Sequence, residues 1–329
     1  MAPSATSVRS KPLVVFTRGV PGTPNVPEAD VRVAPDNPRL PREELLAFIK
    51  GASVIITMFH DKVDAEFLDA AGPQLMGVCN FAVGFDNIDL KTCVVRGVQV
   101  CNTPDAVTEG TANIAWALIL GVARRVLEGD RFVRAGRLER EGNPAITEFL
   151  GVHLTGQNLL ILGPGRIGKA IAMRGLGFGM RVLYASRSRH LDMELAPLAA
   201  RRVEIDDGIR EADVISISTP LTSETRHLID ARRLGLMKKT AIIINTARGP
   251  IIHEAALTEA LREQRIWGAG LDVFEFEPKV SEGLLNLDNV ILTPHIGSAE
   301  RHFREIMTEM VSENAQAILG GKKPPNLVQ

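Results

Sequence analysis

Short apolar runs alternate with amphipathic stretches along most of this chain. In the N-terminal third, apolar runs predict strands at 13–16, 53–57, 75–79 and 97–102. Helical patterns predict helices at 43–50 and 63–70, and the repeated prolines between Pro21 and Pro41 predict loops. Alternation of strand and helix is typical of a parallel sheet. The ligand-facing edge of that sheet is expected where strands end, in the loops 58–61 and 81–86.

A long helix is predicted at 108–125, and it is apolar almost all round between Ile114 and Val122. Such a helix is buried on more than one side, either between domains or in a subunit interface. A polar section follows at 136–144. A second series then alternates strand and helix, with segments at 203, 206–211, 214–218, 230–236, 241–245, 254–264, 268–273, 290–293 and 300–319.

Several strands of this second series are continuous apolar runs, such as AIIIN and VILT. A sheet covered by helices on both faces requires such runs. The prediction is therefore two parallel-sheet α/β domains. The crevice between two such domains is the default place for an active site.

Gly163, Gly165 and Gly168 have the Gly-x-Gly-x-x-Gly spacing, between a predicted strand at 159–162 and a helical pattern at 169–173. The first glycine permits a sharp turn, the second lets backbone approach a pyrophosphate, and the third lets helix pack on strand. The anion then lies on free amides at the helix N-terminus. This order of elements predicts a dinucleotide site.

The helical pattern breaks at the glycines of 175–179, and a second strand is predicted at 181–184. An NAD site usually places an acidic residue after this strand, whereas an NADP site places arginine there. Here the position holds Ser186, Arg187, Ser188 and Arg189, with no carboxylate. A guanidinium group suits a 2′-phosphate because its planar fork donates two hydrogen bonds. NADP(H) is therefore the preferred cofactor, with NAD(H) possible.

Composition restricts the partners. The 329 residues suffice for about two domains, and 45% hydrophobic with 23% charged residues predicts packed cores. A net charge of −1 gives no electrostatic case for nucleic acid or an anionic membrane. No apolar run has the length of a membrane span or a secretory signal, so a cytoplasmic enzyme is expected. Cys79, Cys93 and Cys101 form no metal-binding spacing and are expected to be small core residues.

Three further loops follow apolar runs and carry reactive side chains: NTARGP at 245–250, DVFEFEP at 272–278 and TPHIGSA at 293–299. Together they supply an arginine, several carboxylates and a histidine. Hydride transfer to a ketone needs a proton donor, a carboxylate that orients it, and a cation that binds the substrate and polarises its carbonyl. The three loops offer that set.

These blocks resemble the D-isomer-specific 2-hydroxyacid dehydrogenases, and within that family most closely the glyoxylate/hydroxypyruvate reductases. The resemblance covers nearly the whole chain. The matching blocks, in order, are NFAVGFDNIDL, NTPDAVTEGTANIAWALIL, GDRFVRAG, GPGRIG, PLTSETRHLI, INTARG, GAGLDVFEFEP and LDNVILTPHIGSA.

The resemblance implies a catalytic trio of Arg248, Glu277 and His295, which act on a small 2-oxo acid. His295 is the acid and base, and Glu277 is its partner rather than Glu275, because the family glutamate directly precedes the proline. Arg248 binds the carboxylate and carbonyl of the substrate. The family also implies substrate contacts from the amides of Val83 and Gly84 and from Ser298.

On the cofactor side, the motif and the resemblance together imply contacts from Gly163, Gly165, Arg166, Ile167, Gly168, Ser186, Arg187, Ser188, Arg189, Pro220, Thr246, Asp272, His295 and Gly297. The implied fold is a Rossmann cofactor domain, 105–295, inserted into a discontinuous flavodoxin-like substrate domain, 1–104 with 296–329. A homodimer is implied, and no metal.

The chain departs from its relatives in two places. Pro164 stands in the glycine turn where leucine is common, and 139–146 lacks a tryptophan that many relatives carry. His60 is a substrate contact or an exposed loop histidine, and the latter is favoured. The alternatives in function are a phosphite dehydrogenase, which would carry lysine at the position of Val83, another D-2-hydroxyacid dehydrogenase, and a non-catalytic, dinucleotide-sensing corepressor.

Overall fold

The computed structural model describes residues 11–328, which divide into two compact units. Unit 1 contains the chain up to Val107 together with everything from Ala299 onward, and unit 2 contains 108–298. The sequence placed the domain boundaries at 104/105 and 295/296. Each unit has one sheet, and all strand pairs within the two sheets are parallel. This confirms the predicted α/β class.

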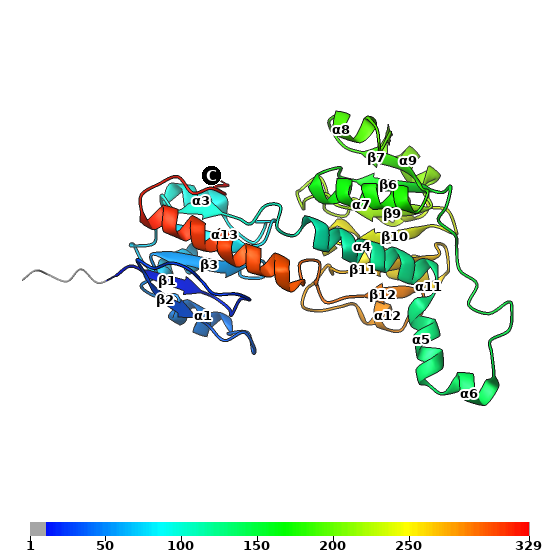
Figure 1. The fold of residues 1–329 in the computed structure, drawn as a ribbon, viewed down its shortest axis with the longest axis horizontal. Coiled ribbons are helices and arrows are strands. Elements are labelled where there is room, and N and C mark those ends of the chain that lie inside the picture. The colour runs from blue at the N-terminus through cyan, green and yellow to red at the C-terminus, as the bar shows by residue number, and fades with distance from the viewer. Residues whose placement is uncertain (1–10, 329) are drawn as a thin grey trace, which may run out of the picture. The chain divides into compact units, whose positions relative to one another are not determined.

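The sheet of unit 1 has the order β2-β1-β3-β4-β5, which is the flavodoxin-like order. Its strands are β1 (Leu13–Phe16), β2 (Asp30–Val33), β3 (Val54–Met58), β4 (Gly77–Phe81) and β5 (Gln99–Cys101). Its helices are α1 (Arg42–Phe48), α2 (Ala65–Ala71), α3 (Leu90–Val95) and α13 (Arg301–Leu319). The last helix packs against β3, β4 and β5, and Figure 1 shows it lying over this sheet.

Two elements of unit 1 were missed. The sequence predicted loops across Asp30–Val33, yet these residues form the edge strand β2, and all four of them are exposed. An edge strand exposed on both faces needs no apolar run. The helix α3 was also unpredicted, since only Cys93 of its six residues is buried.

The sheet of unit 2 has the order β12-β11-β10-β9-β6-β7-β8. Its strands are β6 (Asn158–Leu162), β7 (Arg181–Ala185), β8 (Arg201–Arg202), β9 (Val214–Ile217), β10 (Ile242–Asn245), β11 (Gly268–Leu271) and β12 (Val290–Leu292). This is the Rossmann order with one further strand at the edge. The strand order reverses between β6 and β9, so the ligand crevice is expected outside their carboxyl ends.

Helices cover both faces of this sheet, because successive side chains of a strand point to opposite faces. Leu160 and Leu162 of β6 pack in one core with residues of α9 (Ile205–Glu211) and α11 (Glu254–Arg262). Leu159 and Ile161 pack in the other core with residues of α4 (Thr108–Ala123) and α7 (Arg166–Gly177). Short helices complete the unit: α8 (Leu191–Glu194), α10 (Ala231–Leu234), η1 (Gly249–Ile251) and α12 (Glu282–Leu285).

The helix α4 is buried by contacts inside unit 2, where it packs on β10, β11 and α7. It ends at Ala123, and Arg125 has φ of 53°. The helix α7 ends at Gly177, within the predicted break at the glycines of 175–179. It continues through Gly175, where a Cβ would lie 2.9 Å from Leu159 Cδ2. The glycine there permits close packing of helix on strand.

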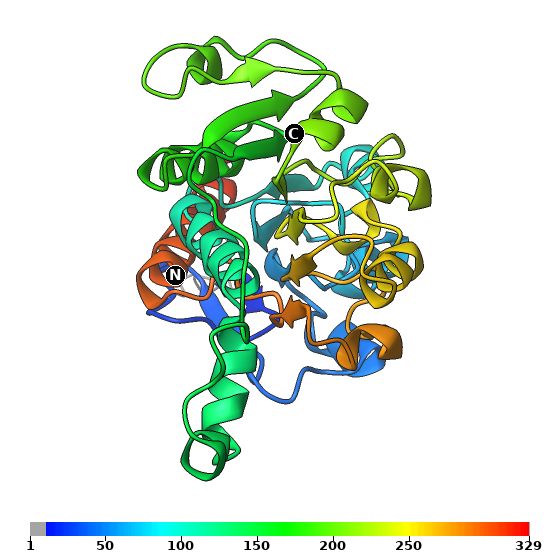
Figure 2. The ribbon, with the colours of Figure 1, turned by 90° about the vertical axis from the view of Figure 1, so that its right-hand side faces the viewer.

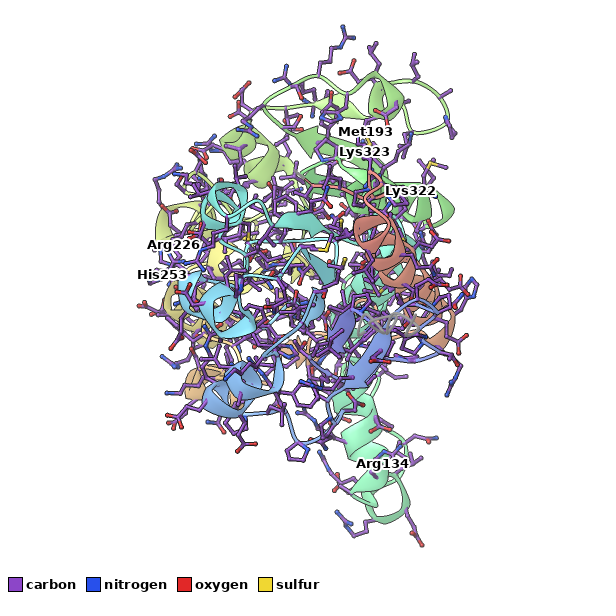
Figure 3. All side chains as sticks on the ribbon, turned by 90° about the vertical axis from the view of Figure 1, so that its left-hand side faces the viewer. Arg134, Met193, Arg226, His253, Lys322 and Lys323 are labelled. Atoms are coloured by element: carbon purple, nitrogen blue, oxygen red, sulfur yellow. The ribbon has the colours of Figure 1, made fainter. Side chains whose placement is uncertain are left out.

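Two helices project from the body of unit 2 as an arm: α5 (Val126–Arg134) and α6 (Arg137–Glu141) (Figures 1 and 2). Arg134, labelled in Figure 3, lies on α5 and pairs with Asp130 at 2.8 Å. The polar section 136–144 is thus partly helical. Among the described residues, none of the helices is both long and apolar enough to cross a membrane.

Candidate active site

The glycine turn joins β6 to α7 in the way that a dinucleotide site requires. Gly163 has φ of +91°, and a Cβ there would lie 2.8 Å from backbone atoms of Thr219. A Cβ on Gly168 would lie 2.3 Å from the carbonyl oxygen of Gly163. Gly165, the N-cap of α7, differs from both, because a Cβ there would meet nothing within 4 Å. The second glycine therefore leaves open space in front of the helix N-terminus.

This open space suits a pyrophosphate, because the first turn of a helix offers unpaired amides and a positive dipole end. Two buried hydroxyls near the crevice also lack a hydrogen-bond partner among the described residues: Ser218 Oγ and Thr246 Oγ1. They follow β9 and β10. Buried hydroxyls normally have a partner, so a polar ligand is expected in this crevice. The residues present fit a dinucleotide.

The remaining predicted cofactor contacts also follow strands or open α7. Arg166, Ile167 and Gly168 form the first turn of α7. The others lie after the carboxyl ends of strands of the unit 2 sheet: Pro220 after β9, Thr246 after β10, Asp272 after β11, and His295 and Gly297 after β12. Carboxyl ends of parallel strands meet at one edge of a sheet, where ligands of this fold class bind.

The four residues after β7, Ser186 to Arg189, differ in which partners their side chains have. Ser186 donates a hydrogen bond to the carbonyl oxygen of Ser188, which makes a tight turn. Arg187 is exposed, and its side chain makes neither a hydrogen bond nor an ion pair within 11–328. Arg189, by contrast, pairs with Glu194 at 2.6 Å. The residues 186–189 themselves carry no carboxylate, but α8 brings Glu194 to the end of β7.

Arg202 of β8 is a further cation at this turn. Its Nη2 donates to the carbonyl oxygens of Ser186 and Arg187, at 3.0 and 3.1 Å. The pairing of β7 with β8 brings Arg202 to the turn, and only the strand order reveals this proximity.

Arg248 lies in the loop after β10 and caps η1. Its Nη1 donates to the carbonyl oxygen of Ala247 at 2.8 Å. Asn245 holds the loop, since its side chain donates to Arg248 O at 2.9 Å and accepts from the amide of Ala247 at 3.0 Å. Gly249 packs so closely on the next loop that a Cβ would lie 1.9 Å from the carbonyl carbon of Phe274. This contact brings the arginine loop against the glutamate loop.

Glu277 and His295 form the central pair. Glu277 Oε2 lies 3.1 Å from Nδ1 of His295, and Oε1 accepts from the amide of Phe274 at 2.9 Å. Burial alone would raise the pKa of Glu277. The hydrogen bond and charge of His295, with the Phe274 amide and the charge of Arg248, hold the pKa below its ordinary value. Glu277 is therefore a carboxylate at neutral pH.

Asp272 holds the loop that carries His295. Its Oδ1 accepts from Thr293 Oγ1 at 2.6 Å and from the amide of Ile296 at 2.8 Å, and its Oδ2 accepts from the amide of Gly297 at 2.8 Å. Burial raises the pKa of Asp272, although these hydrogen bonds and the charge of His295 oppose the rise. The clamp stabilises His295 at φ of 55°, a backbone conformation that side-chain-bearing residues adopt rarely.

The other candidate glutamate has a different partner. Glu275 Oε1 lies 2.5 Å from Nε2 of His227, and Oε2 accepts from the amide of Glu254 at 2.9 Å. In return, Glu254 Oε2 accepts from the amide of Glu275 at 2.8 Å. Glu275 thus ties its loop to the start of α11. Of the two glutamates, only Glu277 contacts His295.

In unit 1, the buried Asn80 and the partly buried Asn102 orient the loop that follows β4. Asn80 Nδ2 donates to the carbonyl oxygen of Gly84 at 2.8 Å, and Asn102 Nδ2 donates to that of Val83 at 2.8 Å. Thr57 donates to Asn80 Oδ1 at 2.9 Å. The amides of Val83 and Gly84 donate to no other described group, which leaves them available to an anion. Sequence reasoning missed the asparagines, although each stands at or just after the end of a strand.

His60 is not the exposed loop histidine that was favoured. Its side chain is only 20% exposed, and Nε2 lies 3.7 Å from Oδ1 of the buried Asp61. Asp61 also accepts from the hydroxyl of Thr17 at 2.5 Å and from the amide of Met58 at 2.9 Å. The loop after β3 is therefore tightly held in unit 1. The alternative role of His60 as a substrate contact stays a prediction.

The three cysteines are free and buried. In the part of the chain that the structure describes, His, Cys, Asp and Glu side chains form no group of three that could hold a metal ion. Ser298 directly follows Gly297 at the end of unit 2.

Comparison with known proteins decides the family. The family described as D-isomer specific 2-hydroxyacid dehydrogenase, NAD binding domain, matches residues 116–297. This chain belongs to that family. It is accordingly an NAD(P)-dependent oxidoreductase that interconverts a 2-oxo acid and a 2-hydroxy acid.

Relatives within the 2-hydroxyacid dehydrogenases match over almost their whole length. The glyoxylate reductase of Thermococcus onnurineus is 46% identical over 97% of this chain and 96% of its own. That of Pyrococcus horikoshii is 47% identical over the same shares. The solved structure of the NADPH-dependent glyoxylate/hydroxypyruvate reductase of Sinorhizobium meliloti, with NADP and malonate, has a TM-score of 0.82 at 31% identity and covers 97% of each chain.

Proposed function

We propose that this 2-hydroxyacid dehydrogenase uses NADPH to reduce a small 2-oxo acid, glyoxylate or hydroxypyruvate, to glycolate or the D-2-hydroxy acid. The observation that carries the chemistry is the 3.1 Å contact between His295 Nδ1 and Glu277 Oε2, beside the arginine loop. The choice of acid is supported by the glyoxylate reductases that are 46–47% identical over nearly the whole chain.

When bound, the nicotinamide dinucleotide supplies the hydride that reaches the carbonyl carbon of the substrate. His295 gives the proton to the carbonyl oxygen. Because Glu277 engages Nδ1, the donating atom is Nε2. Glu277 stabilises the imidazolium before transfer and keeps the ring oriented. The products are a C–OH group and a neutral imidazole, which recovers its proton from solvent.

Arg248 and the amides of Val83 and Gly84 bind the substrate carboxylate, and Ser298 is an additional contact. A guanidinium group binds carboxylates through two parallel hydrogen bonds. It also polarises the carbonyl that receives the hydride. The asparagine-held loop of unit 1 supports this role, because its carbonyls are engaged while its amides are not.

The preference for NADPH is proposed from the cations at the end of β7. Arg187 is exposed there, and Arg202 lies beneath the same turn. The Sinorhizobium relative is named as NADPH-dependent. NADH remains a weaker donor, since the pyrophosphate site at Gly165 is common to both cofactors.

A homodimer is part of the same proposal, and a cytoplasmic location stays a prediction. The arm and the chain after it expose apolar side chains: Val126 and Val133 at 54% each, and Ile146 at 94%. A second copy would cover them. Light scattering after size-exclusion chromatography should give twice 35.7 kDa. A monomer at micromolar concentration would contradict this part.

The test of function is a panel of kcat/KM values for glyoxylate, hydroxypyruvate and pyruvate, each with NADPH and with NADH. The highest values are expected for glyoxylate or hydroxypyruvate with NADPH. If none of the acids supports oxidation of either cofactor, the proposed reaction is wrong. If NADH equals NADPH throughout, the reaction stands and the cofactor preference is wrong.

A further inference from the structure

Arg189, one of the two arginines predicted to bind a 2′-phosphate, already forms an ion pair with a carboxylate. Nε and Nη2 of Arg189 both lie 2.6 Å from Oε2 of Glu194. The other oxygen of Glu194 accepts from the hydroxyl of Tyr184 at 2.6 Å. Both donors therefore come from β7 and the turn that follows it.

Glu194 is held in this position more firmly than its arginine partner. Its side chain is 18% exposed, whereas that of Arg189 is 66% exposed. Met193, labelled in Figure 3, is fully buried and anchors α8 to the core of unit 2. The hydrogen bonds of Arg189 and Tyr184 lower the pKa of Glu194, so the group is a carboxylate at neutral pH.

A fixed carboxylate at the end of the second strand affects a 2′-phosphate in two ways. The phosphate carries nearly two negative charges and is repelled by a nearby carboxylate. It must also displace Glu194 before it can bind Arg189. The ribose hydroxyl of an unphosphorylated dinucleotide is not repelled by Glu194 and does not need to displace it.

We infer that Glu194 is a specificity-determining residue that lowers the affinity of unit 2 for 2′-phosphorylated dinucleotides by competing for Arg189. This inference rests on the proposed use of NADPH. Arg187 forms no ion pair among the described residues and interacts with the carboxylate of Glu224 only through a weak charge–charge attraction, so it remains the main phosphate ligand. Glu194 sets how far NADPH is preferred over NADH.

The size of the effect follows from the exposure of the pair. Exposed ion pairs change equilibrium constants by up to about fivefold, because water and salt screen them. Removing the charge of Glu194 should therefore tighten binding of a 2′-phosphate about two- to fivefold. Binding of the same nucleotide without the 2′-phosphate should not change.

The experiment measures the Kd of two cofactor fragments by calorimetry, so no turnover is needed. Adenosine 2′,5′-bisphosphate carries the 2′-phosphate, and 5′-AMP lacks it. In Glu194→Gln, the side-chain oxygen still accepts from Tyr184, while the charge and the acceptor oxygen that face Arg189 are lost. Glu211→Gln is the matched control, because it removes one carboxylate and one exposed ion pair, with Arg201. Glu211 lies near the start of β6, where Asn158 donates to its carbonyl oxygen.

Glu194→Gln is expected to bind the bisphosphate two- to fivefold more tightly with 5′-AMP unchanged, while Glu211→Gln changes neither. In an Arg189→Ala background the gain from Glu194→Gln should shrink. An unchanged Kd for the bisphosphate overturns the inference, as does an equal gain in the control, which would reflect net charge alone. Thermal unfolding temperatures equal to that of the unaltered protein show that the variants are folded.

The outcomes separate this inference from the proposed cofactor preference. If the unaltered protein binds the bisphosphate no more tightly than 5′-AMP, the preference for NADPH is wrong. A gain in Glu194→Gln would still support the role of Glu194 in that case. If neither protein distinguishes the two nucleotides, both proposals are wrong.

Discussion

The substitution Glu277→Gln tests the central pair with little change in shape. Glutamine is nearly the same size as glutamate and still offers one oxygen to the amide of Phe274. Its NH₂ group then faces Nδ1 of His295 in place of a carboxylate oxygen. The variant therefore loses the charge that stabilises the imidazolium, while the loop keeps its backbone hydrogen bond.

The size of the loss follows from the distance and the exposure. Opposite unit charges 3.1 Å apart attract by about 5 kcal/mol at an effective dielectric constant of about 20, and by about 1 kcal/mol in water. The two side chains are 23% and 31% exposed, so the surroundings lie between these limits. A loss of about 2–3 kcal/mol corresponds to about 30- to 150-fold in kcat/KM.

The assay is steady-state oxidation of NADPH with the best acid of the substrate panel, together with a direct Kd for NADPH. The fall should appear in kcat/KM, and the Kd for NADPH should stay within about twofold. Glu275→Gln is the matched control, because this carboxylate lies in the same loop and contacts His227 instead. A loss below about threefold in Glu277→Gln, or an equal loss in the control, would refute the reasoning.

Three further predictions concern the glycine turn, the cofactor tail and a buried thiol. Gly165→Ala should keep its unfolding temperature yet bind NADPH about tenfold more weakly, because the new methyl group enters only the ligand space. Gly168→Ala should lower the free energy of unfolding by about 2 kcal/mol, because its methyl group would overlap backbone atoms. If thermal unfolding shows Gly165→Ala to be less stable than Gly168→Ala, both predictions are wrong. Arg187→Ala should raise the KM for NADPH about tenfold and that for NADH less than twofold; equal changes would remove the arginine from the phosphate site. Burial raises the pKa of Cys93 to about 11, so little thiolate exists at pH 8. Native protein at pH 8 should therefore label with maleimide far more slowly than unfolded protein.

Much of the fold was predictable because its signals are local. The apolar runs of β6, β10 and β12 identify buried strands, and the spacing of Gly163, Gly165 and Gly168 identifies the turn between strand and helix. Elements with few buried residues escaped prediction. The edge strand β2 exposes all four residues, and α8 buries only Met193. Neither shows the hydrophobic periodicity on which such predictions depend.

The candidate site was predictable as a set of residues but not as a set of contacts. The loops with Arg248, Glu277 and His295 follow apolar runs, so their placement at one sheet edge could be expected. The sequence did not reveal that Asp272 binds the histidine loop or that Gly249 packs on Phe274. These partners lie on different strands, and strand order alone brings them together.

The sequence by itself determined the two α/β units, the dinucleotide turn and the family of the enzyme, because each is written in contiguous runs and short spacings. Only the tertiary structure decided how the charges are paired. The position of α8 pairs Glu194 with Arg189. Likewise, Glu277 pairs with His295, whereas Glu275 pairs with His227. Electrostatic energy falls steeply with distances of a few ångströms. Packing sets those distances, and the spacing of residues along the chain does not.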